Sequence, residues 1–126
     1  MSGFVNHLWN GVTTLHFAKV CNGIIRLNLQ PPHLQHLLPK DISTKYELLN
    51  NFAESFDRTD IQINPTRGGQ TIDRTLSTLN PELNRKLWRA AGYNDPPTIK
   101  SMVAEMTRFD YRTNTDAVMV KGRPIQ

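Results

Sequence analysis

Acidic residues are missing from the first forty positions of this 126-residue chain. The same stretch carries Lys19, Arg26 and Lys40, together with all four histidines of the sequence. An N-terminus that is amphipathic, weakly basic and free of Asp and Glu is typical of segments that organellar import machinery reads. Because the sequence starts with Met1, we expect this segment to be retained and to act as a structural element.

Cysteine is almost absent as well. Cys21 is the only one, which excludes an internal disulfide framework and argues against a cysteine metal site. It lies in an apolar stretch, so we expect a small buried hydrophobic side chain. The chain also has no long hydrophobic run. The most apolar window, Gly3–Leu27, is interrupted by polar side chains, which excludes a membrane-spanning helix. Such a helix could still lie flat on a membrane surface.

The hydrophobic content of 38% is low for a globular domain, and eight prolines and seven glycines divide the apolar runs. We therefore predict a mainly α chain of several short amphipathic helices, with proline-rich connections and no compact independent core. The length allows one small domain over residues 1–126. It would comprise an N-terminal docking helix (1–30), a helical body (40–110) and an extended C-terminal tail (111–126).

The N-terminal helix is predicted over residues 4–27. Val5, Leu8, Val12 and Leu15 form one apolar seam at helical spacing. A second apolar stripe follows on another side, at Phe17, Val20, Cys21, Ile24 and Ile25. A stripe that moves around a helix predicts contacts on more than one side.

Later segments carry clear helix signals. Thr44-x-x-Glu47 fits a capping box and predicts a helix over residues 45–57. Residues 58–70 lose this periodicity, which indicates an extended linker that could hold one short edge strand. A brief helix is predicted over residues 72–79. Asn80 and Pro81 predict the start of another helix that ends near Gly92, and Asp95-Pro96-Pro97 predicts the start of the last one, which runs to Phe109.

The sequence contains no catalytic signature, so we predict that the protein is not an enzyme and has no cofactor. His33 and His36 lack further metal ligands nearby and are expected to be surface or interface groups. His7 and His16 have no neighbouring carboxylate in the sequence and are expected to serve packing. Arg67-Gly68-Gly69 lacks the Lys-Ser/Thr of a phosphate-binding loop, so we expect a flexible turn.

The basic excess lies in the second half of the chain. Residues 66–126 carry ten Lys and Arg against six Asp and Glu, whereas residues 1–65 carry five of each. Such an excess suits an acidic protein partner, an anionic lipid surface or RNA. We favour contacts with protein subunits, with lipid contact open and nucleic acid as the alternative. The predicted partner-binding residues are Phe4, Leu8, Trp9, Val12, Leu15, Arg85, Trp88, Arg89 and Arg112.

One stretch resembles a known family. His36-Leu37-Leu38-Pro39-Lys40, then Thr44-Lys45-Tyr46-Glu47 and Asn51-Phe52, is similar to a segment of subunit 7 (about 14 kDa) of mitochondrial cytochrome bc1 complexes. The resemblance covers about seventeen residues; Leu79–Phe109 does not follow the family's helical region. It implies a matrix-facing, non-catalytic subunit without a cofactor of its own, and it transfers no site residue.

These observations lead to two functional hypotheses. The first is a non-catalytic accessory subunit of a mitochondrial inner-membrane complex, from the respiratory chain or the ATP synthase. It would be bound peripherally, on the matrix side. The alternative is a mitochondrial ribosomal or other RNA-binding protein that uses the basic C-terminal half.

Overall fold

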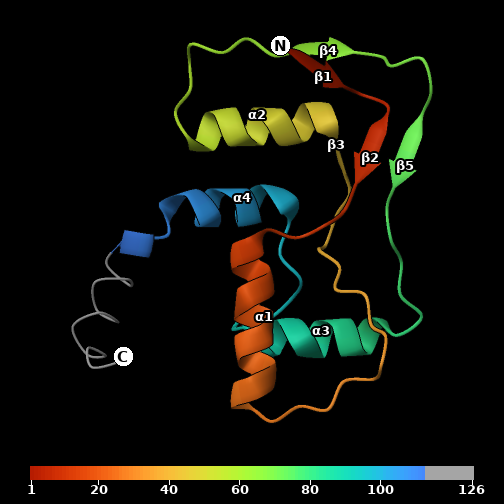
Figure 1. The fold of residues 1–126 in the computed structure, drawn as a ribbon, viewed down its shortest axis with the longest axis vertical. Coiled ribbons are helices and arrows are strands. Elements are labelled where there is room, and N and C mark those ends of the chain that lie inside the picture. Colours follow the sequence, from red (N-terminus) through yellow and green to blue (C-terminus); the bar gives the residue numbers. More distant parts are fainter. Residues whose placement is uncertain (113–126) are drawn as a thin grey trace, which may run out of the picture.

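The computed structural model describes residues 1–112, and over this range the fold is mixed α/β (Figure 1). The prediction of a mainly α fold is therefore wrong. Four helices and five short strands make up the described part of the chain. In chain order they are β1 (Ser2–Phe4), β2 (His7–Trp9), α1 (Thr14–Arg26), β3 (Ser43–Thr44), α2 (Lys45–Ser55), β4 (Asn64–Thr66), β5 (Ile72–Arg74), α3 (Pro81–Ala90) and α4 (Ile99–Arg108).

The strands form two small sheets that join the N-terminus to residues 64–74. β1 pairs in parallel with β4, in the register Ser2 opposite Asn64. β2 lies between β3, which is antiparallel to it, and β5, which is parallel. The first nine residues thus pair with a segment about sixty positions away, and β2 pairs with β3 as well. This is why the predicted helix over residues 4–27 begins at Thr14, where the Thr13 hydroxyl accepts from the His16 amide (3.1 Å).

Buried asparagines hold the irregular segments in place. The Asn6 side chain both donates to and accepts from the backbone of Gly68 (3.0 and 2.9 Å). Asn10 does the same with Leu76 (2.8 and 2.7 Å). Each of these buried side-chain amides pairs with both the N–H and the C=O of one distant residue. It thereby connects two segments that are not strands, as a pair of backbone hydrogen bonds connects two strands.

The region 72–79 also differs from its predicted helix. Ile72–Arg74 is a strand, and the Thr75 amide and hydroxyl both donate to the Asp73 carboxylate (2.9 and 2.6 Å). The backbone amide of Leu76 donates to the side-chain oxygen of Asn10. These amides therefore have partners elsewhere and do not close helical turns.

Local signals are confirmed at α2 and α3. In α2 the Glu47 amide donates to the Thr44 hydroxyl and the Thr44 amide donates to the Glu47 carboxylate, so both halves of the capping box are present. In α3 the Asn80 side chain accepts from the first turn and Pro81 is the first helical residue. Gly92 follows with φ of +100°, a left-handed conformation that suits glycine at a helix end.

The last helix starts later than predicted. Thr98 is its N-cap and accepts from the Ser101 amide (3.1 Å), whereas the two prolines before it remain outside the helix. The predicted extended linker between α2 and β5 does contain one short strand, β4.

A compact core lies where the helices meet, contrary to the prediction of no compact independent core. α2 and α4 run side by side, and α1 crosses α3 below them (Figure 1). The buried members of the core are Val20, Leu87, Trp88, Ile99, Met102 and Val103. Of the predicted tail 111–126, only Tyr111 and Arg112 belong to the described residues.

Candidate functional site

Helix α1 has two apolar faces, and within residues 1–112 only one of them is covered by other parts of the chain. On the inner face Val20 is 3% exposed and Ile24 packs against the core. On the outer face Phe17, Cys21 and Ile25 follow at four-residue spacing, and Phe17 and Ile25 are 56% and 79% exposed. In the neighbouring row Thr14, Ala18 and Asn22 carry no charge, and the exposed Arg26 follows at the end of the helix. We call Phe17, Cys21 and Ile25 the outer face of α1.

The cysteine expectation changes accordingly. Cys21 is half-buried and free, so the prediction that it is a buried side chain is wrong. It lies on the side of α1 that points away from Gly23, because two residues correspond to about 200° around a helix.

The inner face of α1 is fixed closely against α3. A Cβ atom at Gly23 would overlap the carbonyl group of Ala90, so the two backbones are in direct contact there. Arg26 donates from Nη2 to the carbonyl oxygen of Ala90 (3.0 Å) and so places a cation at the C-terminal end of α3. A cation at this end is favourable because the last carbonyl groups carry partial negative charge.

A polar network joins α1 to α4 beside the core. Glu105 of α4 accepts from Lys19, through a short ion pair, and from the hydroxyl of Tyr93 (2.8 Å to Oε1). His16 is fully buried, with Nε2 lying 3.1 Å from Oε1 of Glu105 and Nδ1 lying 2.6 Å from the hydroxyl oxygen of Thr13. Glu105 could not be predicted as the partner of His16 from the sequence, because the two residues are 89 positions apart.

The partners of His16 fix its tautomer. Burial would raise the pKa of Glu105, but hydrogen bonds from Lys19, Tyr93 and His16 lower it to about 2. The carboxylate is therefore ionised and can only accept, so Nε2 of His16 carries the proton. Burial lowers the pKa of His16, which outweighs the opposing hydrogen bond and charge of Glu105. His16 is neutral at pH 7, and Nδ1 accepts from the Thr13 hydroxyl.

The pKa values of Lys19 and Tyr93, the other two members of the network, are raised. Burial works to lower the pKa of Lys19, but hydrogen bonds to Glu105 and Tyr93 raise it on balance. Burial and the hydrogen bond to Glu105 raise the pKa of Tyr93, against the influence of Lys19. The network therefore connects α1 and α4 through Tyr93 and the shared carboxylate of Glu105.

Most of the predicted apolar contact residues are used inside the chain. Trp88 is fully buried and its Nε1 donates to the carbonyl oxygen of Leu38 (2.7 Å); Leu15 is 8% exposed. Neither offers surface to a partner. Trp9 and Val12 pack against the core, and Leu8 lies half-buried in β2. The ring of Phe4 stacks on His7, with centroids 4.4 Å apart.

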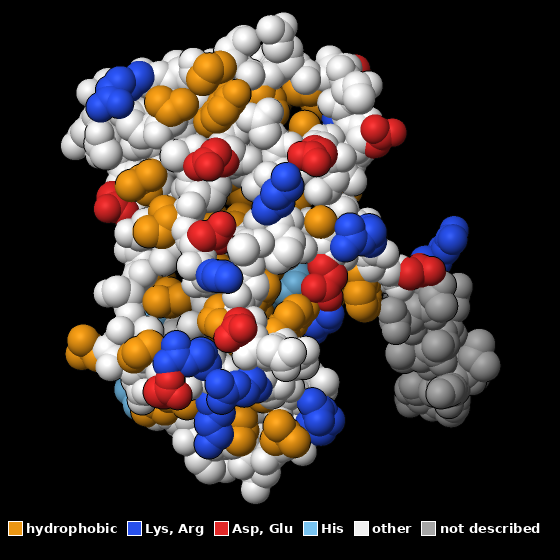
Figure 2. All heavy atoms as spheres, turned by 180° about the vertical axis from the view of Figure 1, so that it is seen from behind, with side chains coloured by type: hydrophobic (Ala, Val, Ile, Leu, Met, Phe, Trp, Pro, Cys, Tyr) orange, Lys and Arg blue, Asp and Glu red, His pale blue; other side chains and the backbone are white. Residues whose placement is uncertain are grey.

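The predicted basic contact residues lie nearer to solvent. Arg89 and Arg112 are exposed, and Arg85 is half-buried and paired with Glu82 one turn earlier. Seen from behind, Lys and Arg side chains gather between apolar ones over the end of the molecule where α3 lies (Figure 2). Arg85 and Arg89 are therefore on one helix surface, whereas Arg112 follows α4.

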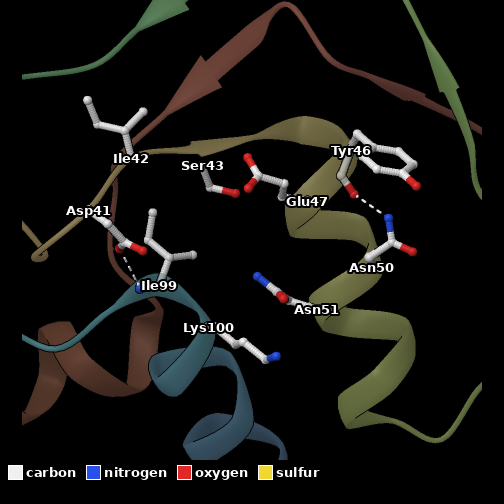
Figure 3. Close-up of a pocket in the computed structure, with 9 residues that line it drawn as sticks. All are labelled: Asp41, Ile42, Ser43, Tyr46, Glu47, Asn50, Asn51, Ile99 and Lys100. Carbon is white, nitrogen blue, oxygen red and sulfur yellow. Dashed lines mark hydrogen bonds between the residues drawn. The ribbon is translucent and has the colours of Figure 1, made fainter.

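A pocket of about 470 Å³ lies between the N-terminal ends of α2 and α4 (Figure 3). Asp41 accepts from the amide of Ile99 (2.9 Å), and Glu47 belongs to the capping box of α2. Both carboxylates are thus engaged in satisfying helix ends. Lys100 forms a long ion pair with Glu54 (3.9 Å). We assign this pocket no catalytic role because its acidic groups serve the helices.

Metal chemistry finds no support in the part of the chain that the structure describes. No three His, Cys, Asp or Glu side chains of residues 1–112 come together as a possible metal site. His36 instead places Nδ1 3.1 Å from the carbonyl oxygen of Ser77, and His33 is exposed.

No family model, curated protein or solved structure matches this chain. The resemblance of the stretch from His36 to Phe52 to the cytochrome bc1 subunit therefore stays a prediction. As for membranes, none of the helices within residues 1–112 combines the length and the apolar character that crossing a bilayer requires.

Proposed function

We propose that this protein is a non-catalytic accessory subunit of a mitochondrial inner-membrane complex, of the respiratory chain or the ATP synthase. It stabilises the assembly by docking α1 against another subunit. The observation that carries the proposal is the uncharged outer face of α1, on which Phe17 and Ile25 are exposed while the opposite face is already buried. A helix that is apolar on both sides is typical of an element enclosed between neighbours.

The shape of the outer face favours a helix of the partner. Phe17, Cys21 and Ile25 form a ridge at four-residue spacing, and such ridges pack into the grooves between the ridges of a second helix. Helix α1 has 13 residues and is therefore about 20 Å long. Small or neutral neighbours such as Ala18 leave room for close approach on one side of the ridge.

The proposed mitochondrial location rests on the composition of the N-terminal segment. The first forty residues contain no Asp or Glu, and import machinery favours such segments. A peripheral position on the matrix side agrees with the absence of a membrane-spanning helix from the described residues.

The test replaces Phe17 and Ile25 by Glu, singly and together, in cells that express the full chain. We expect the purified variants to fold, because both side chains are exposed, and to be lost from the large complex on native gels. Phe56→Glu is the matched control, since Phe56 is also 56% exposed but lies at the end of α2. The proposal fails if the double variant still co-migrates with the complex, or if wild type runs alone.

The RNA-binding alternative has one supporting observation, the exposed cations Lys86 and Arg89 on α3. Trp88 does not assist them, because it is fully buried and cannot stack on a base. Filter binding of the full chain to single-stranded RNA would favour this alternative if Lys86→Gln with Arg89→Gln weakened it and Phe17→Glu did not.

A further inference from the structure

The segment that follows α1 runs along α3, and together they make one end of the molecule, the lower end in Figure 1. Near the C-terminal end of α3, Arg26 donates to the carbonyl oxygen of Ala90. Near the N-terminal end of α3, Leu34 and Leu79 line the same open groove. The segment is held there because the Gln35 amide donates to the hydroxyl of Thr78 (3.1 Å).

Three leucines protrude at this end. Leu79 is fully exposed, at 105% of its reference area, and Leu34 and Leu27 are 75% and 50% exposed. A single exposed leucine is ordinary on a protein surface, whereas several that gather at one end indicate a contact surface. These side chains are exposed to solvent, which suits insertion into a fluid layer such as the interface of a bilayer.

Cations lie at the same end of the molecule. Lys86 shares a shallow pocket with Pro31 of the segment, and Arg89 is exposed one turn later on α3. Arg26 is also exposed. The segment itself lies within the acid-free first forty residues. On α3 the acidic residue is Glu82, which is paired with Arg85.

We propose that this end of the molecule rests on an anionic phospholipid bilayer. Leu27, Leu34 and Leu79 enter the boundary between headgroups and acyl chains, while Arg26, Lys86 and Arg89 contact lipid phosphates. Apolar side chains beside basic ones are the composition that binds in this interfacial layer. The inference deepens the peripheral membrane position of the proposed function and rests on it, but it uses residues other than the outer face of α1.

The geometry favours lipid over the other anionic partners. RNA would contact the cations but would leave the three leucines in water. A protein partner would need a matching hollow for each protruding leucine, whereas a bilayer needs none. An anionic bilayer accounts for both sets: its acidic headgroups complement the cations, and its acyl-chain boundary takes up the leucines.

The experiment is flotation of the purified full chain with vesicles of phosphatidylcholine alone and of equimolar phosphatidylcholine and phosphatidylserine. We expect binding to the second kind, weakening as salt is raised. Lys86→Gln with Arg89→Gln should weaken it by about twenty-five-fold, since each basic residue near the surface contributes a factor of roughly five. Leu34→Ser with Leu79→Ser should also release the protein from the vesicles.

Two control pairs separate a defined surface from general attraction. Arg67→Gln with Arg74→Gln removes the same charge from exposed positions elsewhere, and Ile42→Ser with Phe56→Ser removes exposed apolar side chains elsewhere. Both pairs should leave vesicle binding unchanged. Equal loss in the controls, or a wild-type chain that ignores both vesicles, overturns the proposal. If the leucine variants instead leave the native complex while no vesicle binds, this end contacts protein.

These outcomes are distinct from those of the docking test. Loss of vesicle binding with normal co-migration would leave the accessory-subunit proposal in place. Vesicle binding by the Phe17→Glu and Ile25→Glu variant would show the lipid surface working without the docked complex.

Discussion

Gly23 of α1 lies directly against the carbonyl group of Ala90 in α3, with no room for a Cβ atom between them. This contact sets how closely the two helices cross. It also explains a glycine in the middle of a helix, where alanine would be intrinsically better by about 1 kcal/mol. The same crossing lets Arg26 reach the end of α3.

Gly23→Ala should therefore destabilise the protein despite the better helix propensity. Overpacking a fixed contact costs roughly 1–3 kcal/mol, of which propensity returns about 1 kcal/mol. We expect a net loss of up to about 2 kcal/mol in urea unfolding of the full chain. Asn22→Ala, on the exposed side of the same helix, is the control and should be neutral or slightly stabilising. An unchanged Gly23→Ala variant would show that α1 can move away from α3.

Glu105→Gln should weaken the connection between α1 and α4. The substitution keeps the shape but removes the charge that Lys19, Tyr93 and His16 share. Hydrogen bonds to a charged group are stronger than neutral ones, although the carboxylate is one-third exposed and solvent screens part of the effect. We expect a loss of about 1–2 kcal/mol at pH 7, measured by thermal or urea unfolding. Glu54→Gln, at the long ion pair with Lys100, should cost little.

Stability should fall as the solution is acidified, in two ranges. The pKa of His16 is lowered in the folded state, so its contribution is present above about pH 6.5 and is lost as the pH falls through the folded value. The pKa of Glu105 is lowered from 4.5 to about 2, so its contribution is lost between these values. A pH series of urea midpoints checks this. In Glu105→Gln the lower range should flatten, and an unaltered profile would contradict the assignment.

Asn84→Asp tests the pair of hydrogen bonds that joins α3 to Leu38, in the segment between α1 and β3. Asn84 is buried, accepts from the amide of Leu38 (2.8 Å) and donates to its carbonyl oxygen (3.0 Å). A carboxylate cannot donate, so the change leaves two oxygens facing each other in a buried site. We expect a loss of about 2–3 kcal/mol. Asn22→Asp, which is exposed, should change the unfolding free energy by a few tenths only. Equal effects at both sites would argue against the buried link.

Helices α2 and α3 could be predicted from the sequence because their signals are local. Thr44 and Glu47 of α2, and Asn80 and Pro81 of α3, act within one turn of their own helix, so three-residue spacing was sufficient. The apolar positions between Phe17 and Ile25 also indicated the helix α1, because the order of side chains around a single helix is contained in the sequence. Contact of its outer face with a partner stays a prediction.

Tertiary structure alone decided the rest. Strands form within the first nine residues because the backbone of residues 64–74 pairs with them and because the Asn6 side chain binds Gly68, across about sixty positions. Glu105 reached His16 in the same way, and Trp88, which the sequence suggested as a contact residue, filled the core. The sequence alone determined the acid-free N-terminal segment and the capped starts of α2 and α3. Which apolar side chains remain outside was decided by long-range pairing, since a residue's exposure depends on what packs against it.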